Sequence, residues 1–386
     1  MAKYDIYTAV AMQPEIIAVS KREDIHKNLQ RNLQLIDAAP QCQPSAKEHY
    51  EGNWAPIKLI SFPEFFLTGH EGHWPFDHYV NEVLIEIPGE ETEQVARKAK
   101  EYGVYIAGCA LERDPEWIKD DYIWNTHFII SPKGEIIHKY RKFTPAAHYE
   151  LSVSPHDVYD KYVAMYGDSL SSFFPVTDTE IGKLGTITCM DGHTPETARA
   201  LGVQGAEVIL HPTLVDPCMS PPIETWQMMN RMRAWENLCY VVSAQWGALL
   251  NARRPKHFAP GKSMIVNYNG MVTAYADFPG EAIISSVINL EELRRRRMDP
   301  SRNFQTLLRN EVYRKIYEPT VYPPNQFAQA SPKNRTVRDP RLTIQEFVAK
   351  GIYIAPEKRF DTEATQEKAA SDASEIGQDT ASVVSP

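Results

Sequence analysis

Apolar and polar positions follow two different periods along this chain, which predicts a mixture of strands and helices. Short apolar runs that end at a turn residue, such as Tyr4–Met12 and Lys58–Phe62, predict buried strands. Between such runs, apolar residues recur at helical spacing, as at Ile25, Leu29 and Ile36. Because strands alternate with helices, we expect a layered α/β fold with a mixed sheet.

The expected elements cover the chain from Tyr4 to Arg297. The expected strands are Tyr4–Met12, Lys58–Phe62, Val104–Leu111, Asn125–Ile130, Glu135–Tyr140, Gly185–Cys189, Ala206–Leu210, Cys239–Ala244, Ser263–Asn267, Met271–Ala276 and Ile283–Ile288. The expected helices are Asp24–Ala39, Thr92–Tyr102, Pro195–Leu201, Glu224–Asn237 and one that begins at Glu291. Turn residues at Ser131–Gly134 and Asn269-Gly270 predict two hairpins.

Composition and charge narrow the class of protein. The 386 residues are 43% hydrophobic and 24% charged, which is typical of a soluble globular protein. Since 41 basic residues face 50 acidic ones, the net charge is −9, and a nucleic-acid partner is not expected. The chain has no apolar run of about 18 residues, so we expect no membrane partner.

Cysteine usage and the two ends of the sequence predict a cytoplasmic location. The five cysteines are odd in number and include no CxxC pair, and the N-terminus has no signal-peptide pattern. A Pro-rich stretch begins near Tyr317, and residues 361–386 contain no aromatic residue and an excess of acids. We therefore predict a folded domain over 1–316, a C-terminal extension over 317–360 and a disordered tail over 361–386.

Cys189 is the first candidate for chemistry. It stands at the end of a predicted strand, and Thr194-Pro195-Glu196 then predicts a helix start. Open α/β sheets place their sites at such strand ends, and a helix N-terminus favours a thiolate. The alternative is that Cys189 is a small buried packing residue.

Two charged residues lie at the ends of other predicted strands. Glu64 follows Phe62-Pro63 and is either a surface turn residue or a desolvated base. Lys142 follows Tyr140-Arg141 and either covers apolar surface with its stem or places a fixed ammonium beside an oxyanion.

Together these motifs resemble the nitrilase (carbon–nitrogen hydrolase) superfamily from Tyr4 to about Tyr313. The motif residues are Phe62-Pro63-Glu64, Tyr140-Arg141-Lys142-x-x-Pro145 with Glu150, Cys189-x-Asp191-Gly192-x-x-Pro195-Glu196, and Arg233-Ala234-Trp235-Glu236-Asn237-x-x-Tyr240. The Cys189 motif is closest to the aliphatic amidase and formamidase branch, whereas Gly167–Ser169 and Phe174–Gly185 resemble the nitrilase branch.

The resemblance implies a four-layer α-β-β-α sandwich and a Glu-Lys-Cys triad. Glu64 would be the base, Lys142 and the backbone N–H of Met190 would stabilise the oxyanion, and Cys189 would attack. Glu150 would hold Lys142 in place. The resemblance implies no metal and no cofactor, and it implies a homo-oligomer built from dimers.

The substrate class stays open at this point. We place hydrolysis of a small carboxamide first, nitrile hydrolysis second and N-carbamoyl amide hydrolysis third, because Met190-Asp191 replaces the Trp-Glu typical of nitrilases. A non-catalytic scaffold is the alternative from another class. We expect Phe65, Trp74, Tyr149 and His193 to line the substrate pocket. The histidines of the 70–78 segment lack the spacing of a metal motif.

Overall fold

The computed structural model describes residues 3–42, 55–70, 74–146, 150–214, 223–253, 259–328, 331–334 and 340–356. The chain divides into two compact units. The first unit comprises residues 1–319 and 323–337, and the second comprises residues 320–322 and 338–386. Within the described part of the second unit lies the helix α10 (Pro340–Ala349).

Two six-stranded sheets form the centre of the first unit. The strand order of the first sheet is β14 (Ala282–Asn289), β1 (Ile6–Gln13), β3 (Ile57–Ser61), β4 (Tyr105–Glu112), β5 (Trp124–Ile130) and β6 (Ile136–Arg141). The order of the second is β13 (Val272–Tyr275), β12 (Met264–Val266), β10 (Tyr240–Ser243), β9 (Val208–Leu210), β8 (Gly182–Thr186) and β7 (Val176–Thr179). Both sheets contain parallel and antiparallel pairs, as the alternating pattern predicts.

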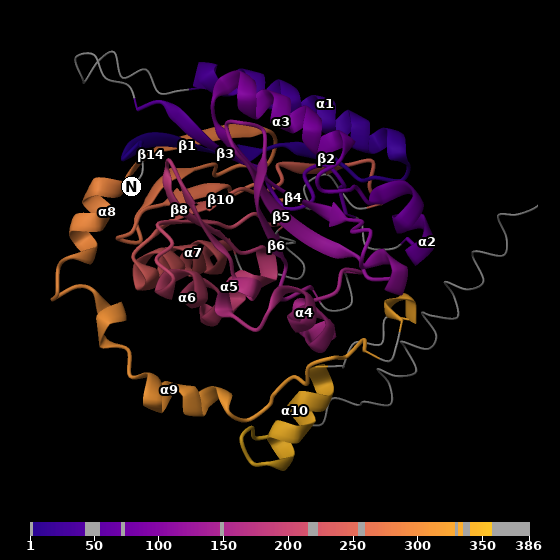
Figure 1. Cartoon of the computed structure of the whole chain (residues 1–386), viewed down its shortest axis with the longest axis vertical. Coiled ribbons are helices and arrows are strands. Elements are labelled where there is room, and N and C mark those ends of the chain that lie inside the picture. The colour runs from indigo at the N-terminus through magenta and orange to yellow at the C-terminus, as the bar shows by residue number, and fades with distance from the viewer. Residues whose placement is uncertain are drawn as a thin grey trace, which may run out of the picture. The chain divides into compact units, whose positions relative to one another are not determined.

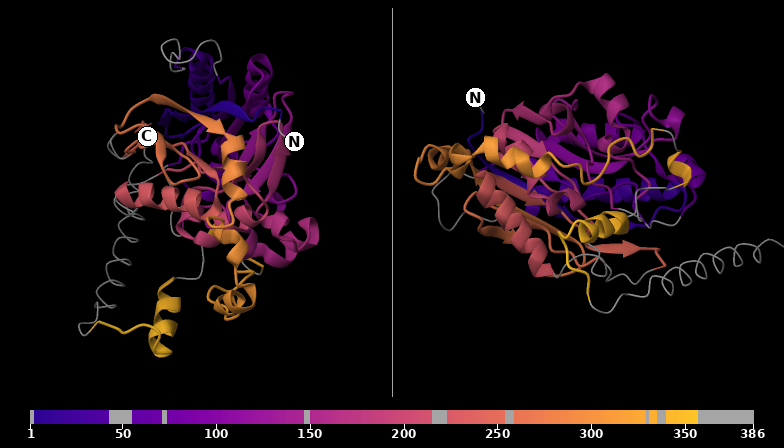
Figure 2. Two further views of the ribbon diagram at one scale, coloured as in Figure 1. Left: turned by 90° about the vertical axis from the view of Figure 1, so that its left-hand side faces the viewer. Right: turned by 90° about the horizontal axis from the view of Figure 1, so that it is seen from below.

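Helices cover the outer faces of the two sheets (Figure 1). Helices α1 (Arg22–Ala38) and α3 (Glu90–Tyr102) lie on one side, and α6 (Pro195–Val203) and α7 (Ile223–Asn237) lie on the other. The remaining helices of this unit are α2 (Phe76–His78), α4 (Tyr159–Tyr166), α5 (Leu170–Phe173), α8 (Leu290–Arg297) and α9 (Asn310–Tyr317). Strand β14 runs directly into α8, as Figure 2 shows. The order of the layers makes the architecture an α-β-β-α sandwich.

Three apolar clusters hold these layers together. The cluster between the sheets includes Ala9, Leu59, Ile129, Leu210 and Val242, which alternate with outward-facing residues along each strand. A second cluster packs α1 and α3 against the first sheet, and a third packs α6 and α7 against the second sheet. Burial of apolar area at about 25 cal/mol per Å² is the main force that stabilises such a stack.

Most expected bounds differ from those of the structure by one to three residues, and two of the differences have a clear physical cause. The predicted strand Gly185–Cys189 is wrong at its end, because β8 ends at Thr186 and Cys189 begins a 3₁₀ turn over Cys189–His193. The Asp191 carboxylate accepts a hydrogen bond from the Thr188 N–H at 2.9 Å, which ends the extended conformation there. Asp24 does not start its helix: α1 begins at Arg22, and the Asp24 carboxylate accepts from the N–H groups of Ser20 and Lys21.

Two short strands carry no clear sequence signal. β2 (Glu15–Ile17) and β11 (Ala248–Leu250) pair in parallel outside the large sheets. Each has only three residues, which is too short for the alternation of apolar and polar positions to show a strand.

Candidate active site

Glu64 lies just beyond the end of β3, with only 1% of its surface exposed. The chain continues the ladder of β3 for one residue, since the Phe62 N–H donates to the Ala107 carbonyl at 2.9 Å. After Glu64 the backbone turns through Phe65, which has a positive φ of 55°. The indole N–H of Trp246 donates to the Glu64 carbonyl oxygen. Strand end, turn and indole thus fix a carboxylate that is shielded from solvent.

Lys142 follows β6 and is also 1% exposed. Its backbone N–H donates to the Asn125 carbonyl of the neighbouring strand at 2.9 Å. Its ammonium donates to Glu64 Oε1 at 2.8 Å and also to Glu150 Oε2. A buried lysine needs paired carboxylates to stay charged, and this one has two.

Glu150 completes the charged cluster and accepts four hydrogen bonds. Its Oε2 accepts from Lys142 and from the Ala146 N–H at 2.7 Å. Its Oε1 accepts from Asn125 Nδ2 at 2.7 Å and from Ser152 Oγ at 2.9 Å. A carboxylate offers about four lone-pair positions, so every position on Glu150 is occupied.

Glu64 accepts one hydrogen bond fewer within the described residues. Its Oε1 accepts from Lys142 at 2.8 Å and from Asn125 Nδ2 at 2.8 Å. Its Oε2 accepts from the Leu214 N–H at 3.0 Å. One lone-pair position therefore remains on Oε2.

Cys189 reaches the same place from the second sheet. Its Sγ lies 3.9 Å from the carbonyl oxygen of Leu214, the residue whose N–H binds Glu64 Oε2. Cys189 has a positive φ of 48°, which an L-residue adopts only where its surroundings hold it. Those surroundings include the Cys189 N–H, which donates to Pro212 at 2.9 Å, and His211 Nε2, which lies 3.0 Å from the Cys189 carbonyl oxygen.

Asp191 links the lysine loop to the cysteine turn. Its buried carboxylate accepts from the Tyr140 hydroxyl at 2.7 Å, from the Thr144 N–H at 2.7 Å and from the Thr188 N–H at 2.9 Å. Helix α6 begins at Pro195 with Thr194 at its N-cap position, as the sequence predicts, although the Thr194 hydroxyl donates to the Asp191 carbonyl oxygen and makes no cap hydrogen bond. This network positions the strand end of Lys142 against the turn of Cys189.

The surroundings move the pKa values of the two carboxylates in opposite directions. Burial raises the pKa of Glu64, and the Lys142 ammonium opposes this only in part. Burial also acts on Glu150, but the Lys142 ammonium and the hydrogen bonds from Ala146 and Asn125 lower its pKa overall. When the pKa values of two neighbouring carboxyl groups are separated in this way, the group with the raised pKa is suited to carry a proton and the other to remain a fixed charge.

The lysine and the cysteine shift in a way that keeps both protonated at neutral pH. The pKa of Lys142 stays well above its usual value: burial lowers it, but the charges of Glu150 and Glu64 outweigh burial. Burial, with the nearby Glu64 charge, raises the pKa of the Cys189 thiol to about 12. The thiol therefore needs a base before it can attack.

The residues expected to line the pocket lie in different surroundings. Phe65 is buried in the cluster between the first sheet and its helices. The half-buried Trp74 donates from its indole N–H to the Val19 carbonyl at 3.2 Å. His193 is exposed on the cysteine turn, with its ring 6.3 Å from that of Trp226, and Met190 is half-buried beside it. Tyr149 lies outside the described residues. The pocket assignments stay predictions.

Sequence reasoning missed three groups that contact Glu64. They are the Asn125 side chain, the Leu214 N–H and the Trp246 indole. Asn125 carried only a weak signal, because it shares the first half of β5 with two other polar residues, Thr126 and His127. A backbone N–H such as that of Leu214 has no signal in a sequence.

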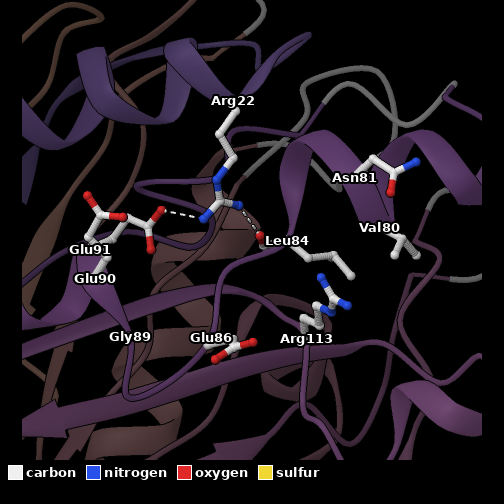
Figure 3. A pocket seen from close by; sticks show the side chains of 9 residues that line it. All are labelled: Arg22, Val80, Asn81, Leu84, Glu86, Gly89, Glu90, Glu91 and Arg113. Carbon is white, nitrogen blue, oxygen red and sulfur yellow. Dashed lines mark hydrogen bonds and ion pairs between the residues drawn. The ribbon is translucent and has the colours of Figure 1, made fainter.

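A separate surface pocket has a different character. It measures about 300 Å³ and is lined by residues from the start of α1, the turn before α3 and the end of β4 (Figure 3). Arg22 donates to Glu91 at 2.7 Å and to the Leu84 carbonyl oxygen. Its lining contains no cysteine, serine or histidine, and its charged residues are Arg22, Arg113, Glu86, Glu90 and Glu91.

The described residues show neither a metal cluster nor a membrane-spanning helix. Within them, three or more His, Cys, Asp or Glu side chains nowhere gather in a way that could hold a metal ion. In the same ranges, every helix is too short or too polar to cross a bilayer.

Comparison with known proteins shows the family of this chain. Residues 8–298 match the model of the carbon-nitrogen hydrolase family. The chain belongs to the carbon-nitrogen hydrolase family. It is thus a hydrolase that acts on carbon–nitrogen bonds other than peptide bonds, and the resemblance inferred from the sequence motifs is confirmed.

Curated relatives and solved structures agree with this assignment. The chain is 31% identical over 266 residues to a formamidase from Helicobacter acinonychis, covering 68% of each chain. It is 32% identical over 239 residues to a formamidase from Bacillus cereus, covering 61% of each chain, so it matches about three fifths to two thirds of these relatives' length.

The structural neighbours confirm the fold. Saccharomyces cerevisiae Nit3, a nitrilase superfamily member, aligns with a TM-score of 0.59 and 24% identity over 76% of this chain and 94% of Nit3. A Nesterenkonia amidase aligns with a TM-score of 0.56 and 16% identity over 80% of this chain and 97% of that chain.

Proposed function

We propose that this carbon–nitrogen hydrolase converts a small carboxamide to its carboxylic acid and ammonia through a thioester on Cys189. The observation that carries the proposal is the unequal occupation of the two buried carboxylates. Glu150 has all its lone-pair positions filled, whereas among the described residues Glu64 keeps one on Oε2, beside the main chain of Leu214 that also contacts the Cys189 thiol. Glu64 is therefore the carboxylate that can take up a proton.

The first half-reaction forms the thioester. The Cys189 thiol gives its proton to Glu64 as the sulfur attacks the amide carbonyl carbon, and the carbonyl oxygen becomes an oxyanion. The Lys142 ammonium and the Met190 N–H stabilise that oxyanion. Lys142 acts as a fixed charge here, because Glu64 and Glu150 keep it protonated. The C–N bond then breaks, and Glu64 returns its proton to the departing ammonia.

The second half-reaction uses the same carboxylate again. Glu64, now ionised, takes a proton from a water molecule, and the resulting hydroxide attacks the thioester carbonyl. The C–S bond breaks, the sulfur recovers the proton from Glu64, and the acid leaves. Glu150 contributes charge and alignment in both halves. The scheme needs no metal and no organic cofactor.

Amides come first among the candidate substrates. The turn Cys189-Met190-Asp191 resembles the amidase and formamidase branch, and the curated relatives at 31–32% identity are formamidases. The same groups could hydrolyse a nitrile through a thioimidate or release ammonia from an N-carbamoyl compound, so both remain alternatives to test.

The decisive test is ammonia release from a panel of compounds by purified protein. The panel contains formamide, acetamide, an aryl amide, an N-carbamoyl amino acid and a nitrile. We expect turnover of a small amide, and we expect Cys189→Ala to abolish it without loss of fold. Cys239→Ala is the matched control, because Cys239 is buried between the second sheet and its helices. Ammonia release by a folded Cys189→Ala protein would remove Cys189 as the nucleophile.

We also propose that the protein forms a homodimer or a multiple of dimers. Helix α7 exposes three large apolar side chains, Met228, Met232 and Trp235. Exposed apolar side chains gathered on one helix favour contact with another chain. Light scattering of the purified protein tests this directly, and a monomer at micromolar concentration would contradict it.

A further inference from the structure

The side chain of Asn125 lies fully buried between the two carboxylates of the site. It projects from the start of β5, and its Nδ2 donates to Glu64 Oε1 at 2.8 Å and to Glu150 Oε1 at 2.7 Å. Its Oδ1 accepts from the Cys109 thiol at 3.0 Å. All three contacts join Asn125 to buried side chains, so neither end of its amide turns to solvent.

These neighbours allow only one orientation of the Asn125 amide. Within the described part of the chain, Asn125 is the one neutral side chain that donates to both carboxylates. If the amide were reversed, its carbonyl oxygen would face two carboxylate oxygens. Such an arrangement would bury acceptors against acceptors, which costs free energy instead of lowering it.

The orientation decides which oxygen of Glu64 is free. Asn125 and Lys142 together fill both lone-pair positions of Glu64 Oε1, and the Leu214 N–H fills one position of Oε2. On Glu150, Asn125 fills a position that would otherwise be open to a proton. Without Asn125, one position would stay open on Glu64 Oε1, beside the bond from Lys142, and one on Glu150 Oε1, beside the bond from Ser152.

We propose that Asn125 is a positioning residue that confines the mobile proton to Glu64 Oε2, where it can pass between the Cys189 thiol, the leaving group and water. This inference rests on the proposed function, because it assumes that Glu64 is the base. Asn125 contacts neither the Cys189 thiol nor the carbonyl group that reacts. It acts through the two carboxylates.

Two substitutions remove the donor in different ways. Asn125→Ala deletes both N–H bonds and leaves the Oε1 atoms of Glu64 and Glu150 each with a vacancy. Asn125→Asp keeps the shape of the side chain and can still accept from Cys109, but it offers at most one O–H donor in place of two N–H donors. Since Asn125 stabilises the ionised form of Glu64, its loss raises the pKa of that carboxyl further.

We expect kcat to fall by about 10- to 100-fold in both variants, with KM changed less than about threefold, because alignment of the base is lost while binding is kept. The acidic limb of the kcat/KM profile should move to higher pH, so that the loss at pH 6 exceeds the loss at pH 8 by about fivefold or more.

Asn237→Ala is the matched control. Asn237 is a buried asparagine whose Nδ2 donates to the Arg233 carbonyl at 2.9 Å on α7, and it contacts no carboxylate of the site. Asn237→Ala should lower the melting temperature and leave the pH profile in place. Cys109→Ala removes the partner of Asn125 Oδ1 only and should change kcat by less than about threefold.

The outcomes separate this inference from the proposed function. If Asn125→Ala and Asn125→Asp keep the wild-type pH profile while Cys189→Ala is inactive, the positioning role is wrong and the proposed function stands. If Cys189→Ala remains active, the proposed function itself fails. Loss of fold in both Asn125 variants would make the residue structural only, and would also overturn the positioning role.

Discussion

At the scale of single residues, the site depends on one buried cation between two buried anions. Lys142 donates to Glu64 and Glu150, and all three side chains are at most 3% exposed. Removing one partner of such a cluster leaves an uncompensated buried charge, which typically costs about 3–5 kcal/mol. The cluster is therefore sensitive to the shape of the cation as well as to its charge.

Lys142→Arg should reduce kcat by about 100-fold or more although it keeps the charge. A guanidinium is planar and longer than an ammonium, so it cannot place a compact charge between the two carboxylates. Lys139→Arg is the matched control, because Lys139 lies on β6, the strand that Lys142 follows, pairs with Glu112 and is partly exposed. Steady-state kinetics of both variants measure the effect, and a kcat near wild type for Lys142→Arg would remove Lys142 from the oxyanion site.

The charged residues of the site could be predicted from the sequence, but their connections could not. The motifs identify Glu64, Lys142, Glu150 and Cys189, and the structure brings these residues together at the strand ends of both sheets. Asn125 stands inside a predicted strand, where a pattern of apolar residues gives the face of a side chain and not its partners. Its role becomes visible only when β5 is placed beside the carboxylates.

At the scale of elements, the strands were predicted more accurately than the turns that carry the chemistry. The expected strand at Gly185–Cys189 ends earlier than its apolar pattern suggests, because hydrogen bonds from Thr188 to Asp191 and from Cys189 to Pro212 form the turn. Asp191 and Pro212 lie outside the predicted strand, so the alternation of its own residues does not reveal these contacts. Phe65 and Cys189 both have positive φ values, which the apolar pattern of a strand does not predict.

His138 joins the two sheets and gives the fold a predictable pH dependence. It lies on β6 of the first sheet, and its ring nitrogens contact Thr177 Oγ1 on β7 and Thr186 Oγ1 on β8 at 2.9 Å each. Burial lowers the pKa of His138 from 6.5 to about 4. In the unfolded chain the imidazole takes up a proton below about pH 6.5, whereas in the folded chain it stays neutral until about pH 4.

The unfolded state therefore binds more protons between these two pH values, and stability falls as the pH falls through that window. His138 should contribute a loss of roughly 3 kcal/mol between pH 7 and pH 4, since each pKa unit corresponds to about 1.4 kcal/mol. Urea unfolding of wild type and His138→Gln at pH 7 and pH 4.5 measures this. The variant should lose less stability than wild type on acidification, and an equal loss in both proteins would contradict the assignment.

At the scale of the whole molecule, the sandwich carries the site and the C-terminal region lies outside it in sequence. The match to the carbon-nitrogen hydrolase family ends at residue 298. Residues 361–386 lie outside the described residues, and their predicted disorder stays a prediction. The domain boundaries at 316 and 360 likewise remain predictions from composition.

Deletion of Asp361–Pro386 should leave kcat/KM and the melting temperature nearly unchanged. The segment has an acidic excess and no aromatic residue, so it can bury little apolar surface. Kinetics, thermal melting and light scattering of the truncated protein test this. A fall of many degrees, or loss of an oligomer that the full chain forms, would show that the tail is a docking arm.

The central claim is that Glu64 is the base that serves a thioester on Cys189. Glu64→Gln keeps the size of the side chain and removes the base from both half-reactions. A reactive acyl donor, such as an activated ester that wild type hydrolyses, can still acylate the cysteine slowly. Without a carboxylate to activate water, the acyl group should then remain on the protein.

Intact-protein mass spectrometry of Glu64→Gln, incubated with that ester, is the most direct measurement. We expect a stable adduct of one acyl group that is absent from Glu64→Gln/Cys189→Ala treated in the same way. If Glu64→Gln is acylated and clears the adduct as fast as wild type, Glu64 is not the hydrolytic base, and Glu150 takes its place as the candidate.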